Sequence, residues 1–489
     1  MRILIQLFAL FALTNASAQI SFYKLYSGTG YDKGEGIVQL EDSSYVITGS
    51  SSSWEGSSQA FLLKLDSLGN YKWSQQYGGP ESEEGKRVLY NKDLGFYVAG
   101  FSNSFSAGDF DAYLIKTNLN GEKIWEKNYG KPTHWERVND AVMALDSGIV
   151  MVGESTDLNS GNTDVLIIKT DKNGDTLWTK NMGSDGEDRA NTIIKLNNNY
   201  LIGGQYFIPD SNMVKGFIIE LNDLGETLRF DTISNKTGNY CVNDLSLGIN
   251  KIYVAGHREI SSINNNAYAG VYDLSGNVIN HYTNNDNGEL RNEKFKQIAY
   301  NIIKNKVALG YQVINSSTYQ DNFDLVLAYF DPTELYWLNQ FQSINNEGLD
   351  QVNEIIPTSD GGYISVGSSE NTGLANFTFN GGTHIYAYKV DNNANYPTTQ
   401  NNYTLNQLVG IEINSEILKG KVYPNPFKDE FTIVLEGAEN SKATLLNNLG
   451  QEIATFNFHS AITYSTSFLS SGTYFLKIGN SVTKLVKLD

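Results

Sequence analysis

Six acidic residues recur at one position of a repeating pattern, and as a group they are the side chains best suited to chemistry. Each stands 17 residues before a glycine that ends a short apolar stretch, and the fifth of the seven copies carries Asn239 there instead. The six are Asp32, Glu83, Glu136, Glu187, Glu293 and Asp350. A ring of carboxylates around one axis could hold Ca²⁺ or bind a basic partner. We favour the alternative that each carboxylate hydrogen-bonds the backbone of a turn or of a neighbouring repeat, because every repeat must satisfy the same interface.

The other reactive side chains match no known catalytic pattern. The five histidines are His134, His257, His281, His384 and His459. None belongs to an H-E-x-x-H motif or a Cys/His cluster, so no zinc motif is visible. The sequence also lacks a G-x-S-x-G elbow, a phosphate loop and a Rossmann glycine pattern. We therefore name no catalytic residue, expect Cys241 to be a structural thiol, and expect no cofactor apart from the Ca²⁺ candidate.

Two weaker signals remain. Residues 171–175 (Asp-Lys-Asn-Gly-Asp) look like the start of a calcium loop, but the downstream Glu of an EF-hand is missing, and a tight hairpin explains them better. Trp54 and Trp135 could stack on sugars, although scattered surface aromatics usually carry no function.

Composition bounds the class of protein. The chain has 489 residues, with 36 basic and 54 acidic side chains and a net charge of −18. An acidic protein of this kind does not track a phosphate backbone, so nucleic-acid binding is not expected. With 40% hydrophobic and 12% aromatic residues the chain can bury a core, and its single cysteine excludes a disulfide scaffold.

The elements that must position these side chains come from an internal repeat. A short strand ending in glycine recurs seven times, with spacings of 51, 53, 51, 52, 54 and 57 residues. The glycines are Gly49, Gly100, Gly153, Gly204, Gly256, Gly310 and Gly367. A second marker, an apolar run ending in Asp or Asn, counts the same seven copies at Asp66, Asn118, Asp171, Asn222, Asp273, Asp331 and Asp391. A glycine often follows this marker after three residues, at Gly69, Gly121, Gly174, Gly225 and Gly276, which we call the hairpin glycines. The first three of these turns then place Trp73, Trp125 and Trp178.

Each copy is predicted to form four strands. Alternating β-branched and aromatic residues favour strands over helices, and the Asp-x-x-Gly turn predicts a tight hairpin. Four-stranded repeats of this length indicate a β-propeller, here with seven blades. The turn resembles the repeats of secreted bacterial propellers and, loosely, quinoprotein blades. It departs from the quinoprotein spacing by one residue and from the sialidase Asp-box, so neither a quinone cofactor nor sialidase chemistry is implied.

The same spacing predicts how the ring closes. The hairpin joins the fourth strand of one copy to the first strand of the next, so the outer strand of each blade comes from the next copy. The seventh copy has no such strand after it. Phe22 and Tyr26 stand 51 residues before Trp73 and Tyr77, so residues 22–27 are predicted to be the outer strand of the last blade, against 385–390. This closure also protects a sheet edge.

The N-terminal residues have the features of a targeting signal. Arg2, an apolar run from 3 to 13 and small residues at 16–18 fit a secretory signal peptide over 1–18, whose removal leaves Gln19 first. No later stretch is long and apolar enough to span a membrane. The propeller is assigned to 19–393. Residues 394–420 contain Pro397 and an Asn-rich stretch, and are predicted to be a linker.

The last module, 421–489, is predicted to be a small all-β sandwich. Its ordered blocks start with Val-Tyr-Pro-Asn-Pro-Phe at 422–427 and end with Lys-Leu-Val-Lys-Leu-Asp at 484–489. This order resembles the type A C-terminal sorting domain of the type IX secretion system of Bacteroidota. The resemblance implies passage across the outer membrane with the type IX machinery as partner, and commonly removal of the domain on arrival. The matching residues are Pro424, Asn425, Pro426, Gly450, Gly472, Tyr474 and Lys484. The alternative is an ordinary sandwich with no address role.

These observations together favour a secreted or cell-surface binding propeller without catalysis of its own. Loops from several blades meet on one face, which suits a glycan or protein ligand. One alternative is a carbohydrate-active enzyme that uses axial carboxylates for acid–base work. Another is a structural surface adhesin.

Overall fold

The computed structural model divides the chain into two compact units, residues 1–405 and 406–489, which are described separately. The residues whose structure is described are 20–28, 30–53, 57–106, 109–233, 238–261, 264–283, 292–314, 323–331, 337–340, 350–370, 382–391, 400–404, 420–423, 427–435, 441–447, 452–459, 461–478 and 481–488. Strands dominate both units, with one short 3₁₀ turn in this part of the chain, η1 (Pro209–Ser211).

Within the described residues, the first unit contains seven groups of four strands, called blades 1 to 7 in chain order. Blade 1 comprises β2 (Asp32–Gln39), β3 (Tyr45–Ser51), β4 (Gln59–Leu65) and β5 (Tyr71–Tyr77). Blade 2 comprises β6 (Glu83–Asn91), β7 (Gly95–Ser102), β8 (Asp111–Thr117) and β9 (Lys123–Tyr129). Blade 3 comprises β10 (His134–Met143), β11 (Ile149–Asp157), β12 (Thr163–Thr170) and β13 (Thr176–Met182). Blade 4 comprises β14 (Arg189–Leu196), β15 (Asn199–Ile208), β16 (Met213–Leu221) and β17 (Thr227–Ile233).

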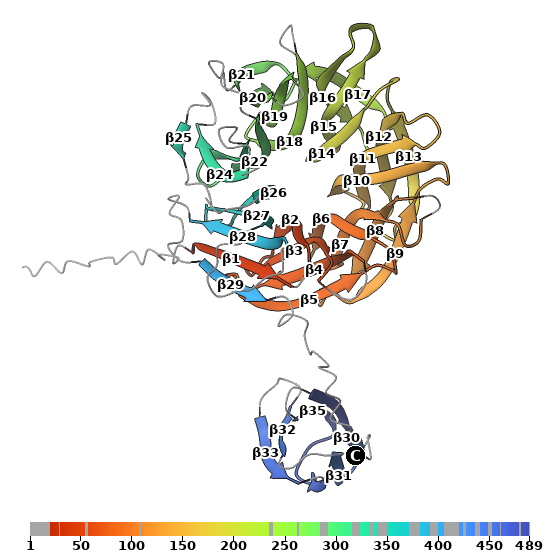
Figure 1. The fold of residues 1–489 in the computed structure, drawn as a ribbon, viewed down its shortest axis with the longest axis vertical. Coiled ribbons are helices and arrows are strands. Elements are labelled where there is room, and N and C mark those ends of the chain that lie inside the picture. The colour runs from red at the N-terminus through yellow and green to blue at the C-terminus, as the bar shows by residue number, and fades with distance from the viewer. Residues whose placement is uncertain are drawn as a thin grey trace, which may run out of the picture. The chain divides into compact units, whose positions relative to one another are not determined.

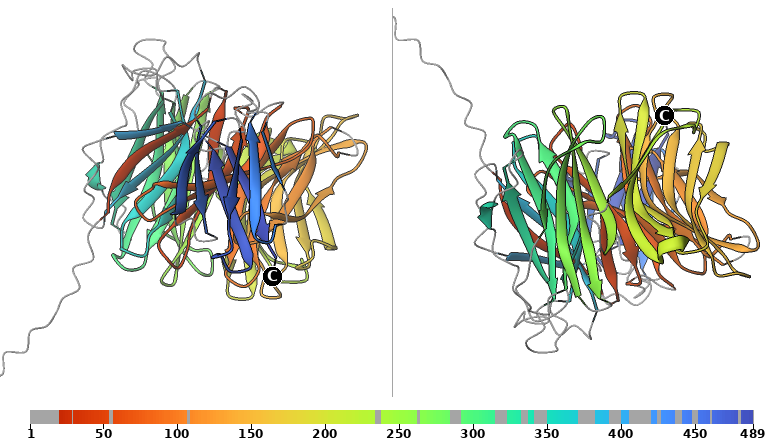
Figure 2. Two further views of the ribbon diagram at one scale, coloured as in Figure 1. Left: turned by 90° about the horizontal axis from the view of Figure 1, so that it is seen from below. Right: turned by 90° about the horizontal axis from the view of Figure 1, so that it is seen from above.

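The later blades follow the same order. Blade 5 comprises β18 (Asn239–Gly248), β19 (Lys251–Ser261), β20 (Asn264–Asp273) and β21 (Val278–Thr283). Blade 6 comprises β22 (Asn292–Asn301), β23 (Lys306–Ile314), β24 (Phe323–Phe330) and β25 (Trp337–Gln340). A single parallel pair, Asn265 with Asn292, links blades 5 and 6. Consecutive blades follow one another around a ring, each with its first strand on the inside (Figure 1), and the side views show the strands of each blade as a twisted sheet (Figure 2).

Blade 7 closes the ring as the spacing predicts. It comprises β26 (Asp350–Pro357), β27 (Tyr363–Ser369), β28 (His384–Val390) and β1 (Phe22–Ser27). β1 pairs antiparallel with β28, from Phe22 opposite Lys389 to Tyr26 opposite Ile385. A fifth strand, β29 (Gln400–Thr404), pairs parallel to the outer side of β1. The prediction of a linker over 394–420 is therefore wrong for residues 400–404, which belong to the last blade.

The hydrophobic core lies between neighbouring blades. One cluster, for example, joins Val46 and Leu62 of blade 1 to Val88 and Val98 of blade 2, all fully or almost fully buried. Each sheet contributes apolar side chains to both of its neighbours, so the middle strands are continuous apolar runs. β3 and β7 are buried along their whole length.

The outer strands fasten each blade to the hairpin of the next. The residue four positions after the hairpin glycine covers the next hairpin glycine: a Cβ placed on Gly121 would lie 2.7 Å from Trp73. Gly121 has a φ of +79°, which the predicted turn requires and which disfavours a side chain there. Phe22 covers Gly69 in the same way, so β1 makes the contacts of an ordinary outer strand.

A β-bulge interrupts the first strand of every blade at the same place. The register between the first two strands shifts by one residue, so one residue of the inner strand has no direct partner. The bulged residues are Glu35, Lys86, Asn139, Asn191, Asn243, Lys296 and Asn353. A bulge re-aims side chains. Two consecutive polar residues in six of the seven inner strands can therefore point toward the centre of the ring, and in blade 1 Gly36 follows the bulged Glu35.

The second unit is a small sandwich of two sheets. One sheet has the order β30 (Gly420–Tyr423), β31 (Glu430–Leu435), β34 (Ala461–Ser465). The other has the order β33 (Glu452–Phe458), β32 (Ser441–Leu446), β35 (Gly472–Ile478), β36 (Ser481–Lys487). Phe431, Leu445 and Leu476 are buried in one core between the sheets. The predicted all-β architecture of both units is confirmed.

Candidate functional site

A cavity of about 220 Å³ lies at the centre of the ring, where the inner strands of all seven blades meet. Two layers of side chains line it. The bulge layer contains the seven bulged residues, Glu35, Lys86, Asn139, Asn191, Asn243, Lys296 and Asn353. The second layer contains the residues that follow six of them: Arg87, Asp140, Thr192, Asp244, Gln297 and Glu354. A further cavity of about 180 Å³ shares this second layer and continues along the axis.

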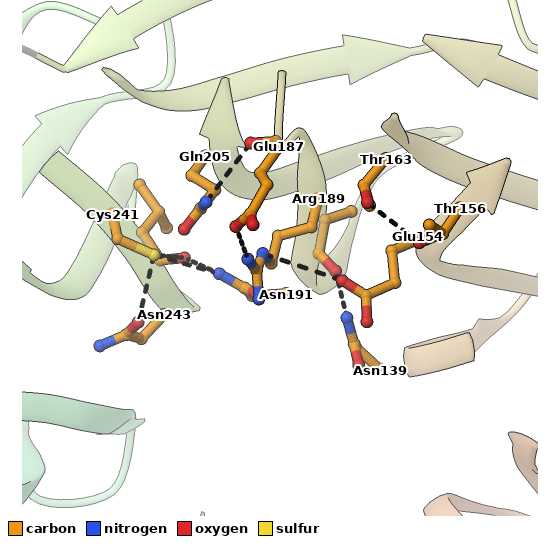
Figure 3. A network of polar contacts seen from close by, with 12 residues as sticks. Asn139, Glu154, Thr156, Thr163, Glu187, Arg189, Asn191, Gln205, Cys241 and Asn243 are labelled. Carbon is orange, nitrogen blue, oxygen red and sulfur yellow. Dashed lines mark hydrogen bonds and ion pairs between the residues drawn. The ribbon is translucent and has the colours of Figure 1, made fainter. Parts of the chain in front are cut away.

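The four asparagines of the bulge layer tie neighbouring blades together. Asn139 Nδ2 donates to the carbonyl of Ala190 at 2.9 Å, and Asn191 Nδ2 donates to that of Val242 at 2.7 Å (Figure 3). Asn353 Nδ2 donates to Gly34 at 2.8 Å, which joins blade 7 to blade 1. In each of these pairs the acceptor directly precedes the bulge of the next blade, so one amide repeats one cross-link around the ring.

Carboxylates of the second layer repeat a second cross-link. Asp140 Oδ2 accepts the N–H of Ile193 at 2.9 Å, and Asp244 Oδ2 accepts that of Ile298 at 2.8 Å. Glu354 Oε2 accepts the N–H of Ile37 at 2.5 Å. Each donor is the second residue after the bulge of the next blade. These carboxylates are therefore engaged by backbone groups of a neighbouring blade.

Basic side chains neutralise part of this acidic layer. Arg87 pairs with Glu354 and lies 3.4 Å from Asp140, so it bridges blades 7, 2 and 3. Lys86 pairs with Glu35 at 2.6 Å. Burial alone would lower the pKa of Lys86, but Glu35 and Glu84 outweigh it and leave that pKa raised.

Two side chains of the cavity, Asp244 and Lys296, could take part in proton transfer or in binding a charged group. Burial raises the pKa of Asp244 to about 7, with the nearby Asp140 charge adding to the effect. Lys296 has neither a hydrogen bond nor an ion pair within the described residues, and burial together with Lys294 lowers its pKa. The cavity can thus exchange a proton at Asp244 and accept one negatively charged group at Lys296.

The acids predicted from the sequence lie outside this cavity, at the start of the inner strands. Asp32 is fully buried and accepts the N–H of Gly28 at 2.7 Å and the hydroxyl of Ser51. Glu83 repeats the arrangement, accepting the N–H of Gly79 at 3.1 Å and the hydroxyl of Ser102 at 2.9 Å. Each acid thereby holds the connection between two blades, which is the backbone-bonding alternative.

The remaining predicted acids differ from Asp32 and Glu83 in their hydrogen bonds or in how much of them the structure describes. Glu136 accepts the hydroxyl of Ser155 at 3.4 Å, and burial raises its pKa to about 7. Glu293 is also buried, and the side chain of Asp350 lies outside the described residues. Within the described part of the chain, no group of three or more His, Cys, Asp or Glu side chains is arranged to hold a metal ion.

The prediction of Glu187 as the acid of blade 4 is corrected by the structure. The Glu187 side chain is exposed and pairs with Arg189 at 2.7 Å, and Arg189 also lies 3.8 Å from Glu154 of blade 3 (Figure 3). The buried acid of blade 4 is its neighbour Asp188, which accepts the N–H of Ser184 at 2.5 Å. The pairing register explains the shift. Ala190 pairs with Gly204 across 14 positions, whereas Gly34 pairs with Gly49 across 15.

Blade 5 contains the same shortening. Val242 pairs with Gly256, also 14 positions apart, so the residue equivalent to the acid is Tyr240 and not Asn239. Asn239 instead accepts the N–H of Val214 at 2.9 Å. In both blades the first two strands are linked by a tight turn, with Asn197 and Asn250 at a φ of +56°.

The weaker candidates have structural contacts. Asp171 Oδ1 accepts the N–H groups of Asn173 and Asp175, both at 2.8 Å, as expected for the hairpin. Trp135 is partly buried, with the guanidinium of Arg137 3.9 Å from its ring centroid, and Trp54 lies outside the described residues. Cys241 is buried and contacts the side chains of Asn191 and Asn243 (Figure 3).

Sequence reasoning missed the axial residues, although a signal exists. Outside blade 1, where Gly36 follows Glu35, a polar pair interrupts every apolar inner strand, and in Lys86-Arg87, Asn139-Asp140 and Asn353-Glu354 it comes three residues after the acid. Two adjacent polar residues break the alternation of a strand, which is what a bulge requires. The polar pair therefore marks both the bulge and the axis.

The second unit supplies the family evidence. Residues 421–488 match the family described as a secretion system C-terminal sorting domain. This match implies export by the type IX machinery to the cell surface or the medium. The described residues include no helix that is long and apolar enough to cross a membrane.

The residues carried over for sorting are only partly described. Tyr474 lies in β35, and its hydroxyl donates to the carbonyl of Ser470 at 2.6 Å. Gly472 begins the same strand, and Lys484 lies in β36 opposite Phe475. Pro424, Asn425, Pro426 and Gly450 lie outside the described residues.

No curated protein sequence matches the chain. Similar solved structures include the WD40 domain of Neurospora crassa Pan2, at 12% identity and a TM-score of 0.44 over 73% of this chain and 88% of that one. The periplasmic gluconolactonase PpgL of Pseudomonas aeruginosa is 11% identical, with a TM-score of 0.43 over 63% of this chain and 84% of that one. The propeller domain of the Pyrococcus furiosus trilobed protease is 11% identical, with a TM-score of 0.39 over 78% of this chain and 100% of that one. All three TM-scores are below 0.5, and the strand pairing alone establishes the blades.

Proposed function

We propose that this chain is an exported binding protein of the Bacteroidota type IX pathway. In this proposal the signal peptide is removed after Ala18, the sorting domain directs passage across the outer membrane, and the propeller binds a glycan or protein ligand without transforming it. The observation that carries the non-catalytic part is the bonding of the axial acids. Asp140, Asp244 and Glu354 each accept a backbone N–H of the next blade.

These bonds argue for a structural role of the axial acids. A general acid or base must move a proton to and from a substrate during each turnover. Here each carboxylate fixes the position of a neighbouring blade, and Arg87 neutralises two of them. The rigid ring then serves as a scaffold for surfaces on and between the blades.

Export is tested by mass spectrometry of the mature protein from culture medium and from a surface fraction. We expect a mature start at Gln19. The mature end is expected after Thr404, because β29 is paired with β1 and removal before it would strip the last blade. The fraction that holds the protein decides between release and anchoring. A cell-retained protein ending at Asp489 would overturn the sorting role.

Binding without turnover is tested on the same mature protein. It is incubated with a panel of bacterial and plant glycans, and both retention on the glycan and release of reducing ends are followed. Retention without new reducing ends supports the proposal. A structural adhesin without a ligand site would show neither retention nor turnover.

A carbohydrate-active enzyme is the second candidate, and one observation favours it. Asp140 and Asp244 flank Thr192, which donates to Asp244 at 3.0 Å, and Asp244 has a pKa of about 7 in the axial cavity. Burial raises the pKa of Asp140 as well, and a pair of carboxyl groups, one of them with a raised pKa, is the usual equipment of glycoside hydrolysis. Release of reducing ends that disappears in Asp244→Asn would establish this candidate in place of the first.

A further inference from the structure

The outer strands follow a rule with three positions. The residues four, six and eight places after each hairpin glycine face the next hairpin. In blade 1 these are Trp73, Gln75 and Tyr77: Trp73 and Gln75 approach Gly121, and Tyr77 donates its hydroxyl to the Gly121 carbonyl at 2.6 Å. In blade 2 they are Trp125, Lys127 and Tyr129, and in blade 3 they are Trp178, Lys180 and Met182. Long side chains thus fill the space between these blades.

The interface between blades 4 and 5 keeps these three positions but departs from the pattern in the size of their side chains. Its three residues are Arg229, Asp231 and Ile233. Arg229 Nη1 still donates to the carbonyl of Leu274 at 2.9 Å, as Trp178 Nε1 does to Asp223 at 3.2 Å. The other two side chains are shorter than their counterparts. A cavity of about 460 Å³ lies beside them, between the outer strands of blades 4 and 5.

Aromatic side chains form much of the wall of this blade 4–5 pocket. They are Phe230, Tyr240, Tyr268 and Tyr272, joined by His281. Tyr240 meets Tyr268 edge to face at 5.7 Å, and His281 stacks on Tyr268 at 6.4 Å. The hydroxyls of Tyr268 and Tyr272 lie 2.7 Å apart. The pocket therefore offers apolar ring faces together with hydroxyl and imidazole groups.

Charge narrows the class of ligand. Asp231 lines the pocket, and its Oδ2 lies 2.8 Å from Nε of Arg229. Burial raises the pKa of Asp231, an effect that Arg229 partly offsets. An anionic ligand would meet the carboxylate at close range, and a cationic ligand would compete with Arg229. A purely apolar ligand would leave the carboxylate without a new partner. A neutral ligand with one apolar face and several hydroxyls satisfies the whole wall.

We propose that the blade 4–5 pocket binds a neutral hexose unit of a glycan. A pyranose presents C–H groups on one face to an aromatic ring and hydroxyls at its edge to groups such as Asp231 and His281. The volume falls in the range of small-molecule sites, which are mostly apolar with a few placed polar groups. This inference rests on the proposed function, in which the propeller is a binding protein, and it names the site and the ligand class.

The test restores the repeat. Ile233→Tyr places the residue of Tyr77 and Tyr129 at the edge of the pocket, where its ring fills the space and its hydroxyl can reach the Gly276 carbonyl. Met182→Tyr makes the same restoration at the preceding interface and is the matched control. Calorimetric titration of the mature protein uses lactose, maltose, cellobiose and N,N′-diacetylchitobiose, with glucuronate as the anionic comparison.

We expect the wild type to bind at least one neutral saccharide, Ile233→Tyr to weaken that binding tenfold or more, and Met182→Tyr to change it less than twofold. Thermal unfolding of Ile233→Tyr at or above the wild-type temperature shows that the loss is not a folding defect. Equal binding by wild type and Ile233→Tyr overturns the pocket and leaves the proposed binding function standing. Binding of glucuronate alone overturns the neutral ligand. Absence of saccharide binding in the wild type overturns the pocket proposal, while a protein ligand would still satisfy the proposed function.

Discussion

The hydroxyl of Tyr26 donates to the carbonyl of Gly69 at 2.6 Å, although 43 residues separate them. Tyr77 makes the same contact with Gly121 at 2.6 Å, and Tyr129 makes it with Gly174 at 2.7 Å. The N-terminal strand β1 therefore makes the same contact with the hairpin of the next blade as the outer strands of blades 1 and 2 do. Ring closure uses the ordinary contact between blades.

Tyr26→Phe tests this closure. Removing the hydroxyl deletes one buried hydrogen bond and leaves the Gly69 carbonyl without that donor, so the free energy of unfolding should fall by about 1–2 kcal/mol. Denaturant unfolding of the mature protein measures it. Tyr77→Phe is the matched control and should cost the same. A cost for Tyr77→Phe with none for Tyr26→Phe would show that β1 is not held in the last blade.

Asn353 tests the axial cross-link at the closure. Its amide donates to the buried carbonyl of Gly34, so Asn353→Asp, which presents an oxygen in place of the amide, should lower the free energy of unfolding by about 1–3 kcal/mol. Asn191→Asp makes the same change between blades 4 and 5 and should cost a similar amount. Denaturant midpoints of both variants are compared. Two unchanged midpoints would remove the amides from any stabilising role.

Calcium tests the role of the acids that precede the inner strands. Asp32 and Glu83 already accept backbone N–H groups and serine hydroxyls. We expect the unfolding temperature of the mature protein to be the same with EGTA and with millimolar Ca²⁺. A binder of Ca²⁺ in the native state would gain stability with ion concentration. A calcium-dependent rise that Asp32→Asn abolishes would contradict the backbone-bonding role.

Regular spacing made much of the fold predictable. The hairpin glycines and the 51-residue offset of Phe22 and Tyr26 from Trp73 and Tyr77 predict strand order, outer-strand exchange and closure, because every blade must present the same contacts to its neighbours. β29 escaped this reasoning. Its sequence, Gln-Asn-Asn-Tyr-Thr, lacks apolar alternation, and it pairs along one edge of β1.

The candidate site was less predictable because counting fails where the backbone changes length. Shorter turns in blades 4 and 5 move the acid position by one residue, from Glu187 to Asp188 and from Asn239 to Tyr240. The bulges hide the axial layers in the same way, since an inserted residue changes which side chains face the centre. The blade 4–5 pocket depends on the size of Asp231 and Ile233, which only packing reveals.

The pH dependence of stability tests the burial of Asp244. Its pKa is raised to about 7, so the folded protein retains a proton that the unfolded chain releases near pH 4. Where the folded state binds more protons, stability falls as pH rises, here between about pH 4 and pH 7. One pKa unit corresponds to about 1.4 kcal/mol, so the loss should be about 2–4 kcal/mol. Denaturant unfolding at pH 5 and pH 8 measures it.

Asp244→Asn should flatten this slope, because an amide does not ionise. Its own cost, from lost acceptor bonds to Thr192 and to the N–H of Ile298, should appear equally at both pH values. Glu136, whose pKa burial also raises to about 7, contributes to the same slope, so Glu136→Gln should remove a separate part of it. A wild-type slope that survives in both single variants and in the double variant would place the retained protons elsewhere, and the axial acid would then be ionised in the native ring.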